Sequence, residues 1–215
     1  MQGTEINPKQ EKANILITKG LREIGITVMP KQVSSFISYL SLIKKWQKAY
    51  SLTSLKTDED IVIKHFLDSC LYLKALPEGS LSLADVGSGA GFPGIPIKIM
   101  RPELNVYLIE PSKKKSAFLR HTIRALGLKG ITVIEQRVED MKNVRFDIAV
   151  TRALWSINEF IAKASPIVKD RGILVISKGP KVKEEIGEIR VDYEMMPAKL
   201  PLSQAKRYLV IIRNV

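Results

Sequence analysis

Residues 81–110 constrain the fold of this chain more than any other stretch. A short apolar run ends in Asp85, glycines follow at positions 87, 89, 91 and 94, and a second apolar run at 106–109 is closed by Glu110. This is the order of a strand, a glycine-rich turn, a helix, a second strand and an acid. In open parallel sheets, ligands bind beyond the carboxyl ends of the strands, where a helix N-terminus offers free N–H groups. We therefore expect Asp85, the glycines and Glu110 at a ligand-binding edge.

Strands and helices are expected to alternate after Leu81. Short β-branched runs predict strands at 81–86, 105–109, 131–135, 146–150 and 172–177, and helical patterns predict helices at 93–100, 112–126, 157–168 and 181–188. Alternation at this spacing indicates right-handed βαβ units and a parallel sheet covered on both faces. The tail contains no helical stretch, so residues 189–195 and 208–213 are expected to finish the sheet as an antiparallel pair.

The first third of the chain has a helical pattern instead. Apolar residues at helical spacing predict helices at 9–23, from Pro30 to about residue 50, and from about 59 to 76. Pro77 and Gly79 then interrupt the pattern. We therefore expect a helical N-terminal extension, residues 1–76, and an α/β domain, residues 77–215.

The charge of the chain suggests the kind of partner. It carries 34 Lys and Arg against 22 Asp and Glu, a net charge of +12. Such an excess favours a polyanion such as RNA or DNA, although it also serves general solubility. No apolar run approaches the roughly 18 residues of a membrane span, and the polar N-terminus resembles no signal peptide, so we expect a cytoplasmic protein. The single cysteine, Cys70, excludes an internal disulfide and a cysteine-based zinc site.

The spacing of the glycines narrows the choice of ligand. Dinucleotide-binding turns read G-x-G-x-x-G, whereas residues 87–91 read G-S-G-A-G and are followed by Pro93, which offers no amide proton to a pyrophosphate. With its flanking acids, this pattern resembles the S-adenosylmethionine loop of Rossmann-like methyltransferases. Glu110 would then accept hydrogen bonds from the ribose hydroxyls. A nicotinamide-dependent reductase is the enzymatic alternative, while a helix-capping Asp85 and a solvated Glu110 are the purely structural ones.

The residues after the fourth expected strand bear on the methyl acceptor. Methylation of pyrimidine carbon 5 uses a cysteine nucleophile. The single cysteine, Cys70, lies in an apolar helix and not at a strand end, which disfavours this acceptor. Exocyclic amines are handled by an Asp/Asn-Pro-Pro-aromatic turn, but residues 149–153 read A-V-T-R-A and contain neither this turn nor a general base for a ribose hydroxyl. An acceptor with a free lone pair needs no base, which favours N7 of guanine.

Several motifs together carry a family resemblance. The segment DVGSGAGFPGIPIKI (85–99), with HFLDS (65–69) before it and EPSKKKSAFLR (110–120) and TRAL (151–154) after it, resembles the glucose-inhibited division protein B family. Members of this family are small-subunit ribosomal RNA guanine-N7 methyltransferases. The resemblance runs from about Val33 to the C-terminus. It implies a class I methyltransferase sheet with a terminal antiparallel pair, S-adenosyl-L-methionine as cofactor, and small-subunit ribosomal RNA or the small subunit as partner.

The resemblance also implies roles for individual residues. Gly87 and Phe92 would contact the cofactor, and Val138 and Glu139 would hold the adenine. Arg152 would lie beside the methyl-transfer site. The transfer would depend on positioning, with no catalytic side chain and no metal. The expected cofactor-binding set is Asp85, Gly87, Gly89, Gly91, Phe92, Glu110, Val138, Glu139 and Arg152. The family commonly has Tyr-Asn-Leu-Thr where residues 50–53 read Y-S-L-T. Ser51 therefore lacks the side-chain amide of the family's asparagine, and we expect no RNA or cofactor contact of that kind here.

Basic residues near the same edge are candidates for RNA contact. They are Lys113, Lys114, Lys115, Arg120 and Lys178, for which a solvated surface is the alternative. His65 is either a core histidine or a functional group near the cofactor. A non-catalytic RNA-binding or assembly protein remains a further alternative, and we expect a monomer.

Overall fold

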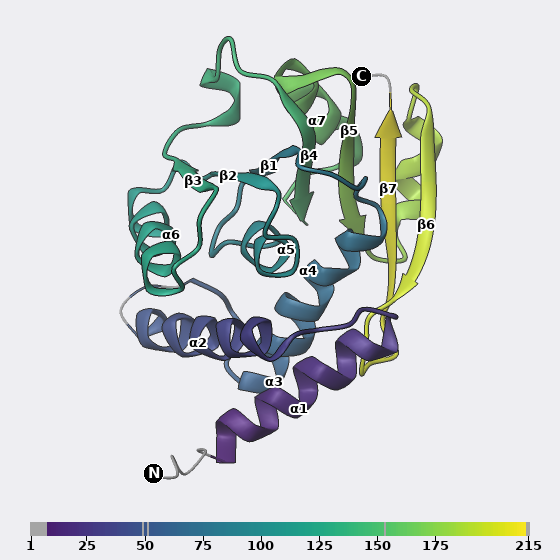
Figure 1. The fold of residues 1–215 in the computed structure, drawn as a ribbon. Helices are drawn as coiled ribbons and strands as arrows, with labels where there is room; N and C mark the ends of the chain where they lie inside the picture. The colour runs from purple at the N-terminus through teal and green to yellow at the C-terminus, as the bar shows by residue number, and fades with distance from the viewer. Residues whose placement is uncertain (1–7, 49, 51, 153, 214–215) are drawn as a thin grey trace.

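A seven-stranded mixed sheet forms the centre of the molecule (Figure 1). The computed structural model describes residues 8–48, 50, 52–152 and 154–213. The strand order is β3-β2-β1-β4-β5-β7-β6, in which β7 runs antiparallel to β5 and β6 antiparallel to β7, while the other neighbours are parallel. The strands are β1 (Ser82–Val86), β2 (Asn105–Ile109), β3 (Ile131–Ile134), β4 (Phe146–Arg152), β5 (Val168–Lys178), β6 (Tyr193–Lys199) and β7 (Lys206–Arg213). The expected α/β sheet with a terminal antiparallel pair is confirmed.

Helices cover both faces of this sheet, as the sequence predicted. Figure 1 shows β4 and β5 pointing towards α4, and the N-terminal helices gathered near that end of the sheet. The longer helices are α1 (Pro8–Glu23), α2 (Pro30–Gln47), α5 (Gly94–Met100), α6 (Lys113–Ala125) and α7 (Ile157–Ala164). The shorter ones are α3 (Asp58–Ile61), α4 (Asp68–Cys70), α8 (Val182–Glu185), η1 (Val62–Leu67), η2 (Leu71–Lys74), η3 (Val138–Asp140), η4 (Ser165–Ile167) and η5 (Ile186–Glu188). Among the described residues, no helix is long and apolar enough to cross a membrane.

Two expected boundaries were wrong for local reasons. The helix predicted to reach residue 168 ends at Ala164, because Pro166 has no amide proton and the chain turns through η4 into β5. The strand predicted at 189–195 lies instead at Tyr193–Lys199, where it pairs with β7 through a short turn closed by Leu200 and Ala205. Pro197 is tolerated there because β6 is the edge strand.

The N-terminal helices share one hydrophobic core with a face of the sheet. Side chains of α1, α2 and η1 belong to the same buried cluster as those of α5 and β1, whereas α7 and α8 cover the other face. Two tyrosines also connect this layer to the sheet, since Tyr39 donates to the carbonyl of Ala90 and Tyr72 to that of Thr151. The helical layer therefore fixes the backbone beside the glycine loop and at the end of β4.

One helical turn in this layer has an unusual geometry. Residues 58–74 are helical without a break, as expected for the third helix, but the stretch η1 is a π-helix. Thr57 caps the start by accepting from the amide of Asp60 at 3.0 Å. A π turn changes the direction in which the following side chains point, and such turns are frequent at functional sites. His65 lies within this turn and Asp68 directly after it.

Candidate active site

The glycine loop after β1 has a backbone that requires glycine. Gly87, Gly89 and Gly91 have φ angles of +72°, +58° and +95°, which side-chain-bearing residues rarely adopt. The amide of Gly89 donates to the Glu110 carboxylate at 2.8 Å. The loop is thereby tied to the end of the neighbouring strand β2, as the sequence argument expected.

Glu110 is almost fully buried, with 5% of its surface exposed. Its two carboxylate oxygens accept from the amides of Gly89 and Ser112, at 2.8 and 2.9 Å. Each oxygen keeps a further lone pair for a ligand hydroxyl. Glu110 is therefore a fixed acceptor at the edge of the sheet, and the solvated strand end considered as an alternative is wrong.

A cavity of about 350 Å³ lies beside Glu110. It brings together four of the expected cofactor residues, Gly87, Glu110, Val138 and Glu139. Lys115, expected to contact RNA, also lines it. The other lining residues were not foreseen, and they are Val86, Ile109, Pro111, Arg137, Leu154, Trp155 and Lys163. A mostly apolar slot with one buried acid suits a nucleoside, whose base is flat and whose ribose carries hydroxyls.

Asp85 lies beneath the glycine loop and does not line this cavity. Its Oδ2 accepts from the amide of Gly94 at 2.8 Å, and because Gly94 is the first residue of α5, Asp85 does cap this helix, as the structural alternative expected. Its Oδ1 is buried and has no hydrogen-bond partner among the described residues. Burial raises the pKa of Asp85 to about 7, against a smaller lowering by the Gly94 hydrogen bond. An unpaired buried acceptor is costly, which is typical of a group that serves a ligand.

A second cavity, of about 420 Å³, lies at the ends of β4 and β5 and contains Arg152. The Arg152 guanidinium donates to the carbonyl of Lys64 at 2.8 Å and to Asp68 at 3.3 Å. It also lies 5.2 Å from the centre of the Phe92 ring. Phe92 thus connects the end of the glycine loop with Arg152. Ala153, within the TRAL motif, and Ser51 lie outside the described residues.

His65 takes part in this second site. The Nη2 atom of Arg152 lies 2.8 Å from His65 Nδ1, and because a guanidinium only donates, Nδ1 accepts in this hydrogen bond. The carbonyl of Lys64 lies farther from Nδ1, at 3.2 Å, so we assign Arg152 as its partner. The ring proton therefore lies on Nε2, 2.6 Å from Thr53 Oγ1. Burial, with the charge of Arg152 as the second cause, lowers the pKa of His65 to about 3. A neutral His65 stacks on Phe92 with 4.5 Å between the ring centres.

Asp68 joins two arginines and was not singled out from the sequence as a site residue. Its Oδ1 accepts from Arg207 at 2.7 Å and its Oδ2 from Arg152 at 3.3 Å. The carboxylate is 6% exposed, and all three side chains line the second cavity. The spacing of three residues between His65 and Asp68, on one side of a helix, was the available signal.

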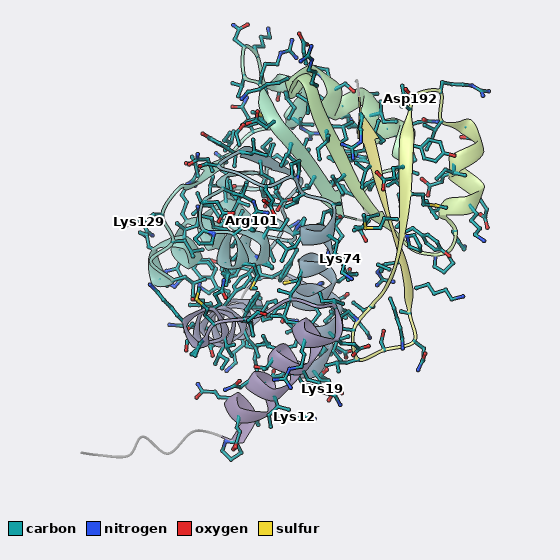
Figure 2. All side chains as sticks on the ribbon, turned by 45° about the vertical axis from the view of Figure 1, so that its right-hand side comes forward. Lys12, Lys19, Lys74, Arg101, Lys129 and Asp192 are labelled. Carbon is teal, nitrogen blue, oxygen red and sulfur yellow. The ribbon has the colours of Figure 1, made fainter. Side chains whose placement is uncertain are left out.

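The five expected RNA contacts lie in different surroundings. Lys113 and Lys114 are exposed at the start of α6, and Arg120 pairs with Glu135 at 2.7 Å. Lys178 is 13% exposed and donates to Glu185 at 2.9 Å. Figure 2 shows Lys12, Lys19, Lys74 and Lys129 on several other elements, so the net charge alone does not locate an RNA surface.

Another hollow, of about 750 Å³, lies between α1 and α3. Three of its lysines pair with carboxylates, and the pairs are Lys12–Glu59, Lys44–Asp58 and Lys64–Asp60. It contains no residue of the glycine loop and is not a candidate for the cofactor. Within the described part of the chain, no group of three His, Cys, Asp or Glu residues could hold a metal ion.

Solved structures with a similar fold are methyltransferases. A methyltransferase from Pyrococcus furiosus superimposes with a TM-score of 0.59 at 11% identity, covering 85% of this chain and 99% of that chain. The M. jannaschii TYW2 structure in complex with AdoMet has a TM-score of 0.52 at 20% identity, covering 68% and 75%. At these identities the likeness shows the fold alone.

Sequence comparisons show the family. The family model GidB, described as rRNA small subunit methyltransferase G, matches residues 32–208. A Ribosomal RNA small subunit methyltransferase G from Pelotomaculum thermopropionicum is 38% identical over 213 residues, covering 93% of this chain and 89% of its own. The protein of the same name from Neisseria meningitidis serogroup B is 34% identical over 196 residues, covering 90% of this chain and 94% of its own. The chain belongs to the rRNA small subunit methyltransferase G family.

Proposed function

We propose that this chain transfers the methyl group of S-adenosyl-L-methionine to N7 of a guanine in small-subunit ribosomal RNA. The observation that carries the proposal is the pairing of two cavities at one edge of the sheet. The first contains Glu110 and the glycine loop, and the second contains Arg152. Lys178 links them, because it lines the second cavity and donates to the carbonyl of Trp155, which lines the first.

The residues of the first cavity fit the cofactor. Glu110 would accept from the ribose hydroxyls, Val138 and Glu139 would hold the adenine, and the loop at Gly87, Gly89 and Gly91 would approach the methionine part closely. The carboxyl group of Asp85 is buried beneath this loop with Oδ1 unpaired, and a cationic ligand bound nearby would favour its ionised form. The sulfonium of the bound cofactor supplies an activated methyl group, and the protein's task is to hold the acceptor in line with it.

The second cavity suits an acceptor that needs no general base. Both oxygens of Asp68 accept from arginines. Of the two ring nitrogens of His65, Nδ1 lies within hydrogen-bonding distance of Arg152 and Nε2 within that of Thr53. Lys178 donates to Glu185. Among the described residues lining this cavity, no carboxylate, imidazole or amine is thus free to remove a proton, whereas N7 of guanine has a lone pair at neutral pH. Arg152 is expected to contact a phosphate or the methionine carboxylate.

RNA would approach over the same edge. We assign phosphate contacts to Lys113, Lys114, Lys115, Arg120 and Lys178, and we expect a cytoplasmic monomer that acts on small-subunit ribosomal RNA or on the small subunit. A nicotinamide-dependent reductase is not supported, because the family match and the G-x-G-x-G spacing both favour a methyltransferase. A purely RNA-binding protein would bind RNA without transferring a methyl group.

The test is mass spectrometry of small-subunit ribosomal RNA from cells with and without this protein. One N7-methylguanosine is expected only where the protein is present, and purified protein with labelled cofactor should restore it. Unchanged modification in the absence of the protein, or no transfer from the labelled cofactor, would refute the proposed function.

Gly87→Ala is expected to weaken binding of S-adenosylhomocysteine by tenfold or more. A methyl group at this position would lie 2.3 Å from Cδ2 of Leu154, so Leu154 must shift within the cavity that both residues line. The positive φ adds about 1–2 kcal/mol of backbone strain. Calorimetric titration measures the affinity. Gly127→Ala is the matched control, because Gly127 has a φ of +61° with no atom within 4 Å of the added carbon. Equal binding by both variants would contradict the assigned role of Gly87.

A further inference from the structure

Trp155 is held on the wall of the first cavity by contacts to its ring. The ring stacks on Phe160 with 6.4 Å between centres and 7° between planes. On the same ring, the ammonium of Lys163 lies 5.7 Å from the centre. Lys163 also pairs with Glu139. The indole is therefore held by two residues of α7, one of which also pairs with a residue expected at the adenine.

The main chain of Trp155 is held as well. Its carbonyl accepts from Lys178 Nζ at 2.7 Å, and Glu185 accepts both from Lys178 at 2.9 Å and from the amide of Ile157 at 3.0 Å. Ser156 then caps α7 by accepting from the amide of Glu159. The segment that carries Trp155 is thus fixed on both sides, which lowers the entropic cost of presenting the ring to a ligand.

The outer edge of the indole lies beside the glycine loop. A carbon added at Gly87 would lie 3.6 Å from Cη2 of Trp155. Among the described residues that line this cavity, Trp155 is the only aromatic one. The remaining lining is aliphatic or charged, with Glu110 beside the expected ribose. A flat, rigid π surface at one wall is the feature that a purine base recognises by stacking.

We propose that Trp155 is a cofactor-binding residue whose indole stacks on the adenine of S-adenosyl-L-methionine. The inference rests on the proposed function for its ligand, but it assigns a contact that neither the glycine motif nor the family resemblance supplied. Stacking of a base on an aromatic side chain changes affinity by about 5- to 150-fold. Because the contact is to the base, the contribution of stacking to affinity should be the same for the whole cofactor and for adenosine alone.

The first test is fluorescence in a Trp46→Phe background, which leaves Trp155 as the sole tryptophan of the two in the chain. Titration with adenosine and with S-adenosylhomocysteine is expected to quench the emission of Trp155 with saturation. If the parent binds S-adenosylhomocysteine in calorimetry but the emission of Trp155 stays unchanged, this inference is overturned and the proposed function is not. If the parent binds neither ligand, both are overturned.

The second test uses substitutions at the same position. Trp155→Leu is expected to weaken both ligands by about tenfold or more and by the same factor, whereas Trp155→Phe should remain within about threefold of the parent. Thermal melting checks that each variant is folded. If Trp155→Leu does not fold, the fluorescence titration alone decides whether Trp155 contacts the base. A folded Trp155→Leu variant that binds adenosine as tightly as the parent would refute stacking.

Discussion

Asp68→Asn is expected to lower the free energy of unfolding by about 3 kcal/mol. The carboxylate lies between the guanidinium groups of Arg152 and Arg207, with nitrogen–oxygen distances of 3.3 and 2.7 Å. An asparagine keeps one acceptor oxygen but turns an NH₂ group towards the other arginine. Two poorly solvated cations then face each other without an anion. We take the lower end of the effect of breaking a buried pair, because Arg207 is 23% exposed.

Methyl transfer should suffer more than cofactor binding in this variant. Asp68 lines the second cavity and not the first, so Arg152 loses its ion pair while Glu110 keeps both of its hydrogen bonds. A displacement of about 1 Å in a positioned group can reduce a rate about 100-fold. We therefore expect kcat to fall by about that factor, with the KM for the cofactor within a few-fold of the parent.

Urea denaturation and steady-state kinetics measure the two effects. Asp192→Asn is the matched control, since Asp192 is exposed (Figure 2) and lies outside both cavities. This control should change stability by less than about 0.5 kcal/mol. A similarly small change for Asp68→Asn would show that the two arginines do not depend on the carboxylate.

The sheet and the cofactor edge could be predicted because they follow from local patterns. The carboxyl ends of neighbouring parallel strands meet at one edge, so an acid after β2 and glycines after β1 must lie close together. The structure confirms this with the 2.8 Å hydrogen bond from Gly89 to Glu110. Val138 and Glu139 came instead from family resemblance, because nothing in the periodicity of their segment indicates a ligand.

The second site could not be predicted because it depends on distant contacts. Arg207 lies 139 residues after Asp68, and Arg152 lies 84 residues after it. Their meeting requires β7 to pair with β5 in one particular register and the π turn to direct Asp68 towards the sheet. A pattern with a period of 3.6 residues contains no information about a π turn. Trp155 was missed for a related reason, since its role depends on Lys178 and Glu185 from later elements.

Asp85 is expected to make the free energy of unfolding fall as the pH rises from 4 to 8. Burial raises its folded-state pKa to about 7 from the unperturbed value of 3.8. Between these values the folded state holds a proton that the unfolded state has released, so rising pH favours unfolding. A difference of about three pKa units corresponds to about 4 kcal/mol. His65 acts in the opposite direction, because its pKa of about 3 makes stability fall as the pH drops below 6.5.

The Asp85→Asn variant separates these two contributions. His65 contributes equally to the parent and the variant, so the difference between their stability curves reports Asp85 alone. Urea denaturation of the ligand-free proteins should give similar free energies of unfolding at pH 4, and a variant more stable by up to about 4 kcal/mol at pH 8. A difference that does not depend on pH would contradict the raised pKa.

Asp85→Asn should also bind the cofactor less well, because the cost of burying this carboxylate is offset when a cation is bound. A positively charged ligand near the unpaired Oδ1 favours the ionised acid and lowers its pKa. S-adenosyl-L-methionine should therefore stabilise the parent more at pH 8 than at pH 5, as measured by thermal shift at constant ligand concentration. The asparagine variant should show no such difference. If the cofactor raises the melting temperature of parent and variant equally at both pH values, Asp85 only supports the loop backbone through Gly94 and does not respond to the charge of the cofactor.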